Sequence, residues 1–240
     1  MLTIIIPVRN EAENVEKTFN IIKNSKLNFS YEVLFINDFS EDQTYGKIKN
    51  LEKNNTEVKV CDNSRKGLGG AITTGIEEAK GDYTCIMMAD LSDDIEDLKK
   101  YYELMNMNEV DAVFGSRFLK TSKVVDYPKK KLILNRIFNF IVKLIFFNSY
   151  NDYTNAFKIY KTSVIKSFIP LVSESFNVFL EMPLKLISRN YKMKIIPINW
   201  TTRKEGKAKF DIKELRSKYL FTLIYCFVEK ILLGNKKWNF

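Results

Sequence analysis

The stretch CIMMADLSDD (residues 85–94) joins a short apolar run to a cluster of carboxylates. Asp93 and Asp94 suit the first turn of a helix, because acidic side chains stabilise a helix N-terminus and Ser92 is a good cap. Asp90 precedes that cap, at the point where a buried strand passes into its loop. Helix capping does not explain Asp90, so it is the first candidate for chemistry.

The chain of 240 residues contains no histidine. This excludes Ser-His-Asp and Cys-His nucleophile systems, HExxH metal sites and histidine general bases. Catalysis must therefore use carboxylates, lysine, arginine, backbone groups or a hard metal ion held by oxygen ligands. The three cysteines lie far apart in the sequence. They indicate neither a zinc knuckle nor a disulfide framework, so we expect a reducing cytosol.

Short apolar runs alternate with helix-like segments over residues 1–115. We predict strands and helices at these ranges: strands 2–8, 31–37, 57–62, 82–88 and 110–115; helices 11–25, 41–52, 68–79 and 95–106. Such alternation is typical of a mostly parallel α/β sheet covered on both faces. Sites in these sheets form at the carboxyl ends of the strands. Four consecutive ends are polar here: PVRNE (7–11), NDFSED (37–42), NSRKGLGG (63–70) and ADLSDD (89–94).

The glycine-rich stretch GLGGAITTG does not match a nucleotide-binding fingerprint. Gly67 and Gly69 fit G-x-G, but Ile72 occupies the third glycine position of the dinucleotide motif. No Gly-Lys-Ser/Thr follows at the spacing of a P-loop. Lys66 and the glycine backbone remain suited to a phosphate at a helix start.

Charge is distributed unevenly along the chain. Residues 1–120 hold 15 Lys and Arg against 21 Asp and Glu, a net charge of −6, whereas residues 121–240 hold 23 against 8, a net charge of +15. The basic half favours an anionic partner, such as a phosphorylated substrate or an acidic membrane face. It shows no helix-turn-helix, RRM or KH pattern, so we expect no nucleic acid. The length and the 45% hydrophobic content favour one folded soluble domain with an appendage.

Taken in order, these motifs resemble those of the inverting family-2 glycosyltransferases. The branch most similar comprises dolichyl-phosphate mannose synthases and bacterial polyprenyl-phosphate glycosyltransferases. The resemblance runs through IIIPVRNEAENV, VLFINDFSEDQT, NSRKGLGGAITTGIEEAKGDY, MADLSDD, GSRF, DYTNAFKIY and FNVFLEMPLKLISRNYKMKIIPINWTTRKEGKAKF. It implies a GT-A (Rossmann-like) domain at 1–210, with a donor half at about 1–116 and an acceptor half at about 117–210. A membrane-proximal helical segment follows at 211–240.

The resemblance also implies a donor site for a UDP- or GDP-linked sugar. The implied donor-binding residues are Pro7, Arg9, Glu11, Asn37, Asp38, Lys66, Gly67 and Asp90. Asp90, with Ser92, is implied to hold a Mg²⁺ or Mn²⁺ ion that bridges the donor diphosphate. Both are hard ions that take carboxylate, water and phosphate oxygens, and either neutralises charge on the leaving group.

Three positions depart from the family pattern. Met88 replaces the first acid of the Asp-x-Asp pair, so we expect weaker metal binding that depends more on diphosphate oxygens and water. Asn37 stands where an aspartate is frequent, and Asp38 supplies the acid there. Ala208 replaces a serine, which removes one hydroxyl contact.

The acceptor determines which groups the reaction needs. A sugar hydroxyl needs a general base, for which Asp152, Thr154 and Glu181 lie in the family pattern. A phosphate monoester is already anionic and needs cations to position it. The resemblance implies acceptor-binding roles for Arg117, Lys131, Asn135, Arg203 and Lys209, and catalytic roles for Asp90, Arg117 and Arg203.

The expected reaction is therefore inverting transfer of a hexose to a polyprenyl phosphate of the dolichyl or undecaprenyl type. One alternative is transfer to a saccharide hydroxyl in surface polysaccharide synthesis. A second alternative is a catalytically silent protein that binds a sugar nucleotide or a lipid phosphate. The sequence does not indicate an oligomeric state.

Two segments of the basic half favour contact with a membrane surface. Residues 127–151 carry five cations and no acid, and Asn135, Asn139 and Lys143 recur every four residues, as in an amphipathic helix with a polar stripe. The uncharged run 219–228 is shorter than the roughly 20 apolar residues of a spanning helix. With no signal peptide pattern at the start, we expect a cytoplasmic protein, peripheral on the anionic cytoplasmic face of the membrane.

Overall fold

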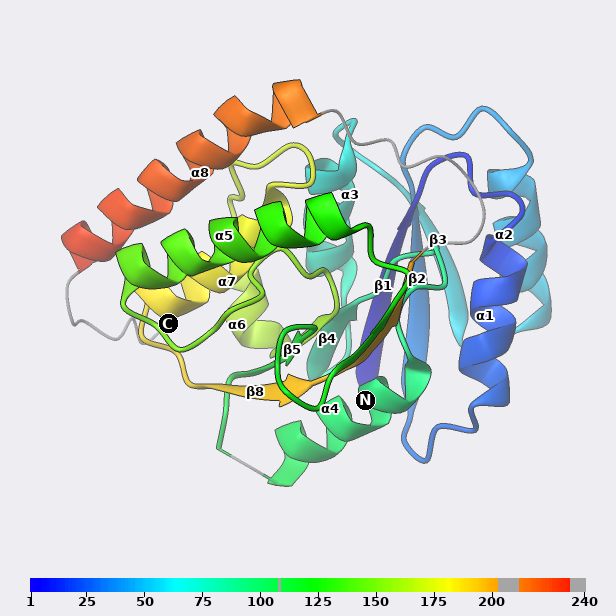
Figure 1. Cartoon of the computed structure of the whole chain (residues 1–240). Coiled ribbons are helices and arrows are strands. Elements are labelled where there is room, and N and C mark those ends of the chain that lie inside the picture. Colours follow the sequence, from blue (N-terminus) through cyan, green and yellow to red (C-terminus); the bar gives the residue numbers. More distant parts are fainter. Residues whose placement is uncertain (108, 203–211, 234–240) are drawn as a thin grey trace.

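The computed structural model describes residues 1–107, 109–202 and 212–233 (Figure 1). A seven-stranded sheet has the order β3-β2-β1-β4-β7-β5-β8, and β6 and β9 form a separate pair. The strands are β1 Leu2–Val8, β2 Tyr31–Asn37, β3 Val58–Asp62, β4 Tyr83–Ile86, β5 Ala112–Ser116, β6 Lys123–Val125, β7 Lys158–Lys161, β8 Met193–Pro197 and β9 Asn199–Thr201. Among the described strands of the large sheet, β7 is the one that runs antiparallel to its neighbours, β4 and β5.

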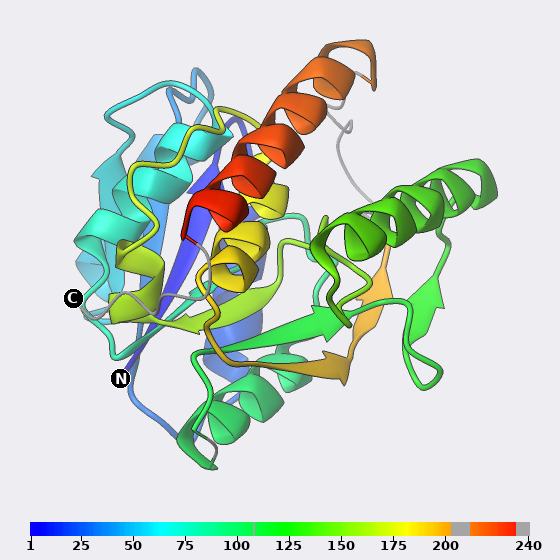
Figure 2. The same ribbon diagram turned by 90° about the vertical axis from the view of Figure 1, so that its left-hand side faces the viewer.

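Helices cover both faces of the sheet. Their bounds are α1 Val15–Asn24, α2 Thr44–Asn54, α3 Leu68–Glu78, α4 Ile95–Met107, α5 Lys129–Phe146, α6 Thr162–Lys166, α7 Val178–Ser188 and α8 Ile212–Leu233. One hydrophobic core contains side chains of α1, α2 and α4, and the other contains side chains of α3, α5, α6, α7 and α8. Figure 2 shows α5 and α8 on the outside of the helical layer that also contains α3, α6 and α7, with α7 beneath α8. The predicted α/β architecture is confirmed.

Burial of both faces explains the continuous apolar strands. In β1, Ile4 and Ile6 enter the core under α1 and α2, whereas Ile5 enters the opposite core. Successive strand residues point to opposite faces, so a strand buried on both sides is apolar throughout. Strands 2–8 and 31–37 match the prediction in full. The predicted helices 11–25 and 41–52 begin later, because residues 11–14 and 41–43 form turns instead.

The parallel strands bring the predicted polar ends to one edge of the sheet. β1 lies between β2 and β4, with Pro7 opposite Ile36 and Val8 opposite Asn37 in register. β2 also pairs with β3, which places Asn37 opposite Asp62. The loops after β1, β2, β3 and β4 therefore emerge side by side. We call them the strand-end loops (residues 9–14, 38–43, 63–67 and 87–94).

Candidate active site

The loops after β1 and β2 are bound to each other. Glu41 N donates to Asn10 Oδ1 (2.8 Å), and Glu11 N donates to Thr44 Oγ1 (2.8 Å). These bonds cross from one loop to the other, so they fix the backbone of both. Arg9 and Glu11, two predicted donor residues, consequently lie beside the end of β2.

Asp38 ties the glycine-rich turn to the end of β2. Its Oδ1 accepts hydrogen bonds from Asn63 Nδ2 (2.7 Å) and from Gly67 N (2.8 Å), and the residue is buried. Next to it, Asn37 Nδ2 donates to Asp62 Oδ1 (3.0 Å). The structure therefore brings the predicted donor residues Asn37, Asp38 and Gly67 together. It also shows that part of the role of Asp38 is to hold the turn.

The turn at Gly67 has a backbone shape that requires glycine. Its φ is +108°, and a Cβ added there lies 2.7 Å from Glu174 O. α3 begins at the next residue, Leu68, and Lys66 is exposed just before the turn. A helix N-terminus beside a lysine is suited to a phosphate group, in agreement with the predicted role of Lys66.

Ser92 does not cap the helix that follows it, so that prediction is wrong. Its hydroxyl donates to Asp90 Oδ1 (2.6 Å), and its backbone N donates to the same oxygen (3.1 Å). The cap of α4 is Asp94, whose Oδ1 accepts a hydrogen bond from Glu96 N (3.0 Å). Ser92 and Asp90 thus form one local unit at the end of β4.

Asp93 is also not the solvated helix-end acid that we expected. It forms a β-bridge with Trp200, and its Oδ2 is enclosed without a hydrogen-bond partner among the described residues. The pKa of Asp93 is raised to about 8, mainly by burial and also by the negative charge of Asp90, against the opposing effect of Arg117. A pKa of about 8 leaves Asp93 largely protonated at neutral pH, so Asp90 supplies the negative charge at the end of β4.

This charge fits a hard divalent cation, although few protein ligands are present. Asp90 and Ser92 offer a carboxylate and a hydroxyl oxygen, and the enclosed Asp93 carboxylate lies near. Met88 is partly buried and packs against the hydrophobic core that contains side chains of α3 and α5–α8. Within the described residues, no group of three or more His, Cys, Asp or Glu side chains is arranged to bind a metal. A cation there needs most of its ligands from a diphosphate and from water.

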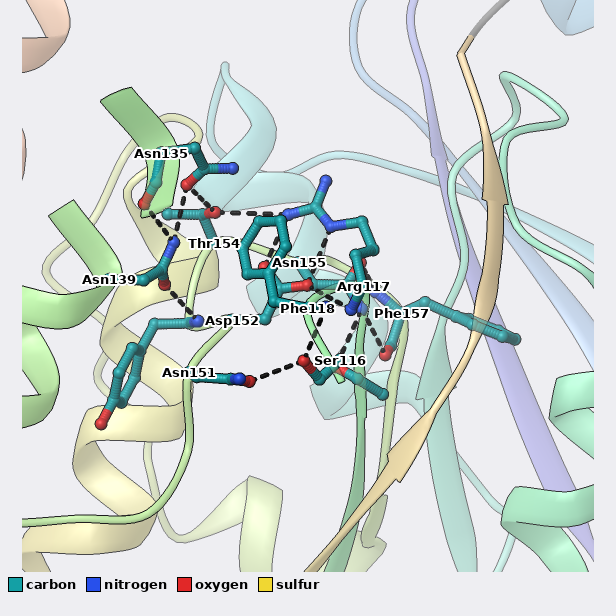
Figure 3. A network of polar contacts seen from close by, with 12 residues as sticks. Ser116, Arg117, Phe118, Asn135, Asn139, Asn151, Asp152, Thr154, Asn155 and Phe157 are labelled. Carbon is teal, nitrogen blue, oxygen red and sulfur yellow. Dashed lines mark hydrogen bonds and ion pairs between the residues drawn. The ribbon is translucent and has the colours of Figure 1, made fainter. Parts of the chain in front are cut away.

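Arg117 follows β5 and forms a buried ion pair with Asp152 (Figure 3). Arg117 Nε donates to Asp152 Oδ2 (2.9 Å) and Nη2 donates to Oδ1 (2.7 Å). The Arg117 backbone N also donates to Oδ2 (2.9 Å). The Arg117 side chain is 8% exposed and that of Asp152 is fully buried, so the pair fixes the guanidinium in one orientation.

Aromatic rings surround the same guanidinium. Its Cζ lies 5.5 Å from the ring centre of Phe118, 5.7 Å from that of Tyr127 and 5.5 Å from that of Trp200. Burial lowers the pKa of Arg117, but Asp152 raises it more, so the net shift is upward. Arg117 stays a cation throughout the physiological range.

The polar side of α5 joins this network. Asn135 Oδ1 accepts from Thr154 Oγ1 (2.9 Å) and from Asn139 Nδ2 (2.7 Å), while Asn135 Nδ2 donates to Tyr127 Oη (2.8 Å). Asn139 Oδ1 in turn accepts from Tyr153 N (2.6 Å). We call these contacts, together with the Arg117–Asp152 pair, the Arg117 network. Asn135 thus anchors α5 to the loop at 151–157 beside its predicted acceptor position.

Lys131 lies close enough to both Arg117 and Asp90 for their charges to interact. Burial and the charge of Arg117 lower the pKa of Lys131, and the charge of Asp90 opposes this shift. The fold therefore gathers the predicted donor and acceptor residues Asp90, Arg117 and Lys131 at one site. Arg203, Ala208 and Lys209 lie outside the described residues.

Neither Asp152 nor Glu181 is accessible enough to act as the base that we considered. Asp152 is paired with Arg117, and Glu181 is fully buried, with its two oxygens bound to backbone N–H groups of Val172 (2.9 Å) and Ser173 (2.8 Å). Thr154 has its hydroxyl committed to Asn135.

Sequence reasoning missed Tyr127 and Trp200, two of the rings beside Arg117, which themselves lie 5.0 Å apart. They come from loops and a short strand far apart in the sequence. Their only sequence signal was that aromatic residues flank a basic segment. That signal is too weak to assign a contact.

A family model for glycosyl transferase family 2 matches residues 3–168. The dolichol-phosphate mannosyltransferase of Pyrococcus furiosus is 27% identical over 216 residues, which cover 89% of this chain and 60% of that protein. The glycosyltransferase AglD of Haloferax volcanii is 24% identical over 217 residues, covering 88% of this chain and 34% of that protein. The chain thus spans less than two thirds of the length of these relatives.

Solved structures show the same fold. Glucosyl-3-phosphoglycerate synthase from Mycobacterium tuberculosis, in complex with Mn²⁺, UDP and glucosyl-3-phosphoglycerate, superposes with a TM-score of 0.72 at 12% identity. The superposition covers 95% of this chain and 80% of that one. The fold is the GT-A fold, and the chain belongs to glycosyl transferase family 2.

Proposed function

We propose that this protein transfers a hexose, with inversion, from a nucleoside diphosphate sugar to a polyprenyl phosphate. The observation that carries the proposal is the position of Lys131 near both Arg117 and Asp90, with Asp152 and Glu181 sequestered. An arginine held in one orientation and a neighbouring lysine, with Asp152 and Glu181 inaccessible as bases, suit an acceptor that is already anionic. A phosphate acceptor fits this description better than a sugar hydroxyl. The mannosyltransferase relative, by its name, acts on dolichol phosphate.

On the donor side, the strand-end loops bind the nucleotide, with Asp38 and Gly67 holding the turn and Lys66 beside the diphosphate. A Mg²⁺ or Mn²⁺ ion, held by Asp90 and Ser92, supplies charge neutralisation for the leaving diphosphate. Arg117 holds the acceptor phosphate in line with the sugar, because its own orientation is fixed by Asp152. Arg203 and Lys209 complete the predicted acceptor site.

An exposed apolar surface supports a lipid acceptor. The polar Asn135 and Asn139 point into the protein, so the apolar side of α5 faces outward. Exposed apolar side chains on both helices form what we call the α5–α8 face: Ile133, Leu134, Ile137, Phe140, Ile141, Leu144, Leu220, Phe221, Ile224, Val228 and Ile231. The helices contact each other through Phe138 and Tyr219 (ring centres 5.6 Å apart). Such a surface is suited to the outer layer of a bilayer.

None of the described helices has both the length and the apolar character needed to cross a membrane. We therefore propose peripheral attachment through the α5–α8 face, with cations such as Lys129 and Lys130 near anionic lipid headgroups. We propose that the protein attaches to the cytoplasmic side of the membrane.

A direct test uses purified protein, UDP- and GDP-linked hexoses, Mn²⁺ or Mg²⁺, and a short polyprenyl phosphate in vesicles. We expect release of nucleoside diphosphate that depends on both metal and acceptor, with an inverted glycosyl phosphate as product. A product formed only with saccharide acceptors supports the hydroxyl alternative. Nucleotide binding without turnover on either acceptor class supports the silent binding protein.

A further inference from the structure

Two charged side chains of α7 are completely buried outside the site described above. Glu181 is 0% exposed and Lys185 is 1% exposed, and they lie one helical turn apart with Lys185 Nζ 3.3 Å from Glu181 Oε1. Burying an ion pair is costly, and a well-packed apolar pair is often as stable or more so. Stability alone is therefore a weak reason for charged residues at these positions.

The pair holds one loop by its backbone. Lys185 Nζ donates to Phe168 O (2.7 Å) and Pro170 O (2.8 Å). The carboxylate of Glu181 accepts from the N–H groups of two residues further along the loop, Val172 and Ser173. Four main-chain groups of residues 168–173 are thus fixed by two side chains from a rigid helix.

The other side of this loop presses against the glycine-rich turn. Gly69 N donates to Glu174 O (3.0 Å), and a Cβ added at Gly69 lies 1.8 Å from Ser173 O. A Cβ at Gly67 lies 2.7 Å from Glu174 O. The two backbones are therefore in direct contact, and glycine permits this approach.

The contacts form a continuous series from α7 to the end of β2. Glu181 and Lys185 fix the loop, the loop carbonyls of Ser173 and Glu174 fix the turn, and Gly67 N reaches Asp38 Oδ1 (2.8 Å). We propose that Glu181 and Lys185 are positioning residues that set the Gly67–Gly69 turn for the donor diphosphate. The ligand in this inference rests on the proposed function, but the control of the turn does not.

The first test measures the turn without any ligand. Hydrogen exchange followed by mass spectrometry reports the amides of Gly67 and Gly69, whose bonds go to Asp38 and Glu174. In Lys185→Met, we expect these amides to exchange about tenfold faster than in the wild type, because the loop loses its support. Unchanged exchange in a folded Lys185→Met protein overturns the proposal.

Glu229→Gln is the matched control. Glu229 forms a partly buried ion pair with Arg189 of the same layer (2.8 Å) but has no hydrogen bond or ion pair to the 168–174 loop among the described contacts. The substitution weakens the packing of α8 against α7 and removes no contact of the Gly67–Gly69 turn. If Glu229→Gln speeds exchange at Gly67 and Gly69 as much as Lys185→Met does, the effect is general loosening and the proposal fails.

The second test measures donor binding. UDP and GDP, each with Mn²⁺, are titrated into the wild type, and the nucleotide that binds is used for the variants. We expect Lys185→Met and Glu181→Gln to raise its Kd about tenfold and to raise the donor KM, with the acceptor KM unchanged. Equal rises in both KM values contradict a specific effect on the turn. If the wild type binds neither nucleotide, the proposed function fails, and the exchange experiment still decides the role of the pair.

A double-mutant cycle completes the design. Gly69→Ala disturbs the same contact from the opposite side and leaves the buried pair intact. We expect its effect on turn exchange to be non-additive with that of Lys185→Met, and additive with that of Glu229→Gln. Should Lys185→Met and Glu181→Gln not fold, Gly69→Ala alone decides, because unchanged exchange and nucleotide Kd in that variant rule out the contact as a determinant of the turn.

Discussion

The strand-end loops and the Arg117 network place their charges in opposite ways. In the loops, Lys66 is exposed and Asp90 is half-buried, whereas the network buries Arg117 against a fully buried Asp152. The donor diphosphate and its cation carry their own charges, and the loops leave Lys66 and Asp90 accessible to bind them. The acceptor side instead fixes one cation in advance. This difference predicts that mutations in the loops affect ligands more than stability, and that mutations in the network do the reverse.

The largest effect is expected at Asp90. Asp90→Asn removes the carboxylate implied to hold the metal, so turnover should fall by about a thousandfold or more. Nucleotide binding should weaken only when Mn²⁺ or Mg²⁺ is present. Activity assays and nucleotide titrations with and without metal measure both.

Asp94→Asn is the control for that variant, because Asp94 caps α4 and belongs to the same acidic cluster. It should keep full turnover. Turnover that survives a chelator in the wild type contradicts the metal at Asp90.

Asp152→Asn should lower the stability of the protein and leave nucleotide binding almost unchanged, in contrast to Asp90→Asn. It leaves the buried guanidinium of Arg117 without its anionic partner, a change that typically costs about 3–5 kcal/mol. Denaturant unfolding measures this loss, and nucleotide binding by the folded fraction should stay close to that of the wild type.

Asp111→Asn provides the comparison, because Asp111 pairs with Lys161 at the surface (3.0 Å). That pair should contribute less than about 1 kcal/mol. Similar losses of stability in the two variants would mean that the Arg117–Asp152 pair contributes no more than an ordinary surface ion pair.

The sequence predicted the loops better than the network for a physical reason. Apolar runs such as 2–8 and 31–37 fix strands, and parallel strands bring their ends together without further information. Arg117 and Asp152 are 35 positions apart, and their pairing depends on the antiparallel β7, which no local pattern predicts. Asp93 was misassigned because it forms a β-bridge with Trp200 in β9, which is far away in the sequence. For α5, the repeat of Asn135 and Asn139 indicated a polar stripe but not that it faces the protein.

The buried Lys158, next to the Arg117 network, should make the stability of the protein depend on pH. Its Nζ donates to Tyr153 O (3.1 Å), and burial lowers its pKa to about 7, although Asp152 opposes this shift. The unfolded lysine titrates near its ordinary pKa of 10.5, so between these values the unfolded state binds more protons than the folded state. Stability should therefore rise with pH above 7, by at most about 1.4 kcal/mol per pH unit from this group. Unfolding at pH 7, 8 and 9 measures the slope, which Lys158→Met should reduce.

Met88 tests whether the missing acid of the Asp-x-Asp pair can be restored. Because Met88 packs against the hydrophobic core, Met88→Asp should place a carboxylate in apolar surroundings and cost about 2 kcal/mol. For a chain of this size that lowers Tm by roughly 4–8 °C. A melting curve and a Mn²⁺ titration on the same protein measure both effects. Tighter metal binding with an unchanged Tm shows instead that position 88 faces the site.

The smallest effects are expected on the α5–α8 face, where two single substitutions separate apolar from electrostatic attachment. Phe140 is 58% exposed, so Phe140→Ser should lower binding to vesicles about tenfold, whether the vesicles are neutral or acidic. Lys129→Gln removes one cation and should lower binding about fivefold to acidic vesicles only, an effect that high salt abolishes.

Flotation with vesicles of both compositions measures these two effects, and circular dichroism confirms that the exposed substitutions leave the fold intact. Quadruple replacement of Lys129, Lys130, Lys131 and Arg136 by Gln should reduce flotation and use of the lipid acceptor while nucleotide binding is retained. If Phe140→Ser floats as well as the wild type, the apolar side of α5 does not enter the membrane. If only the cation variants abolish binding, the attachment is electrostatic, as the basic second half of the sequence first indicated.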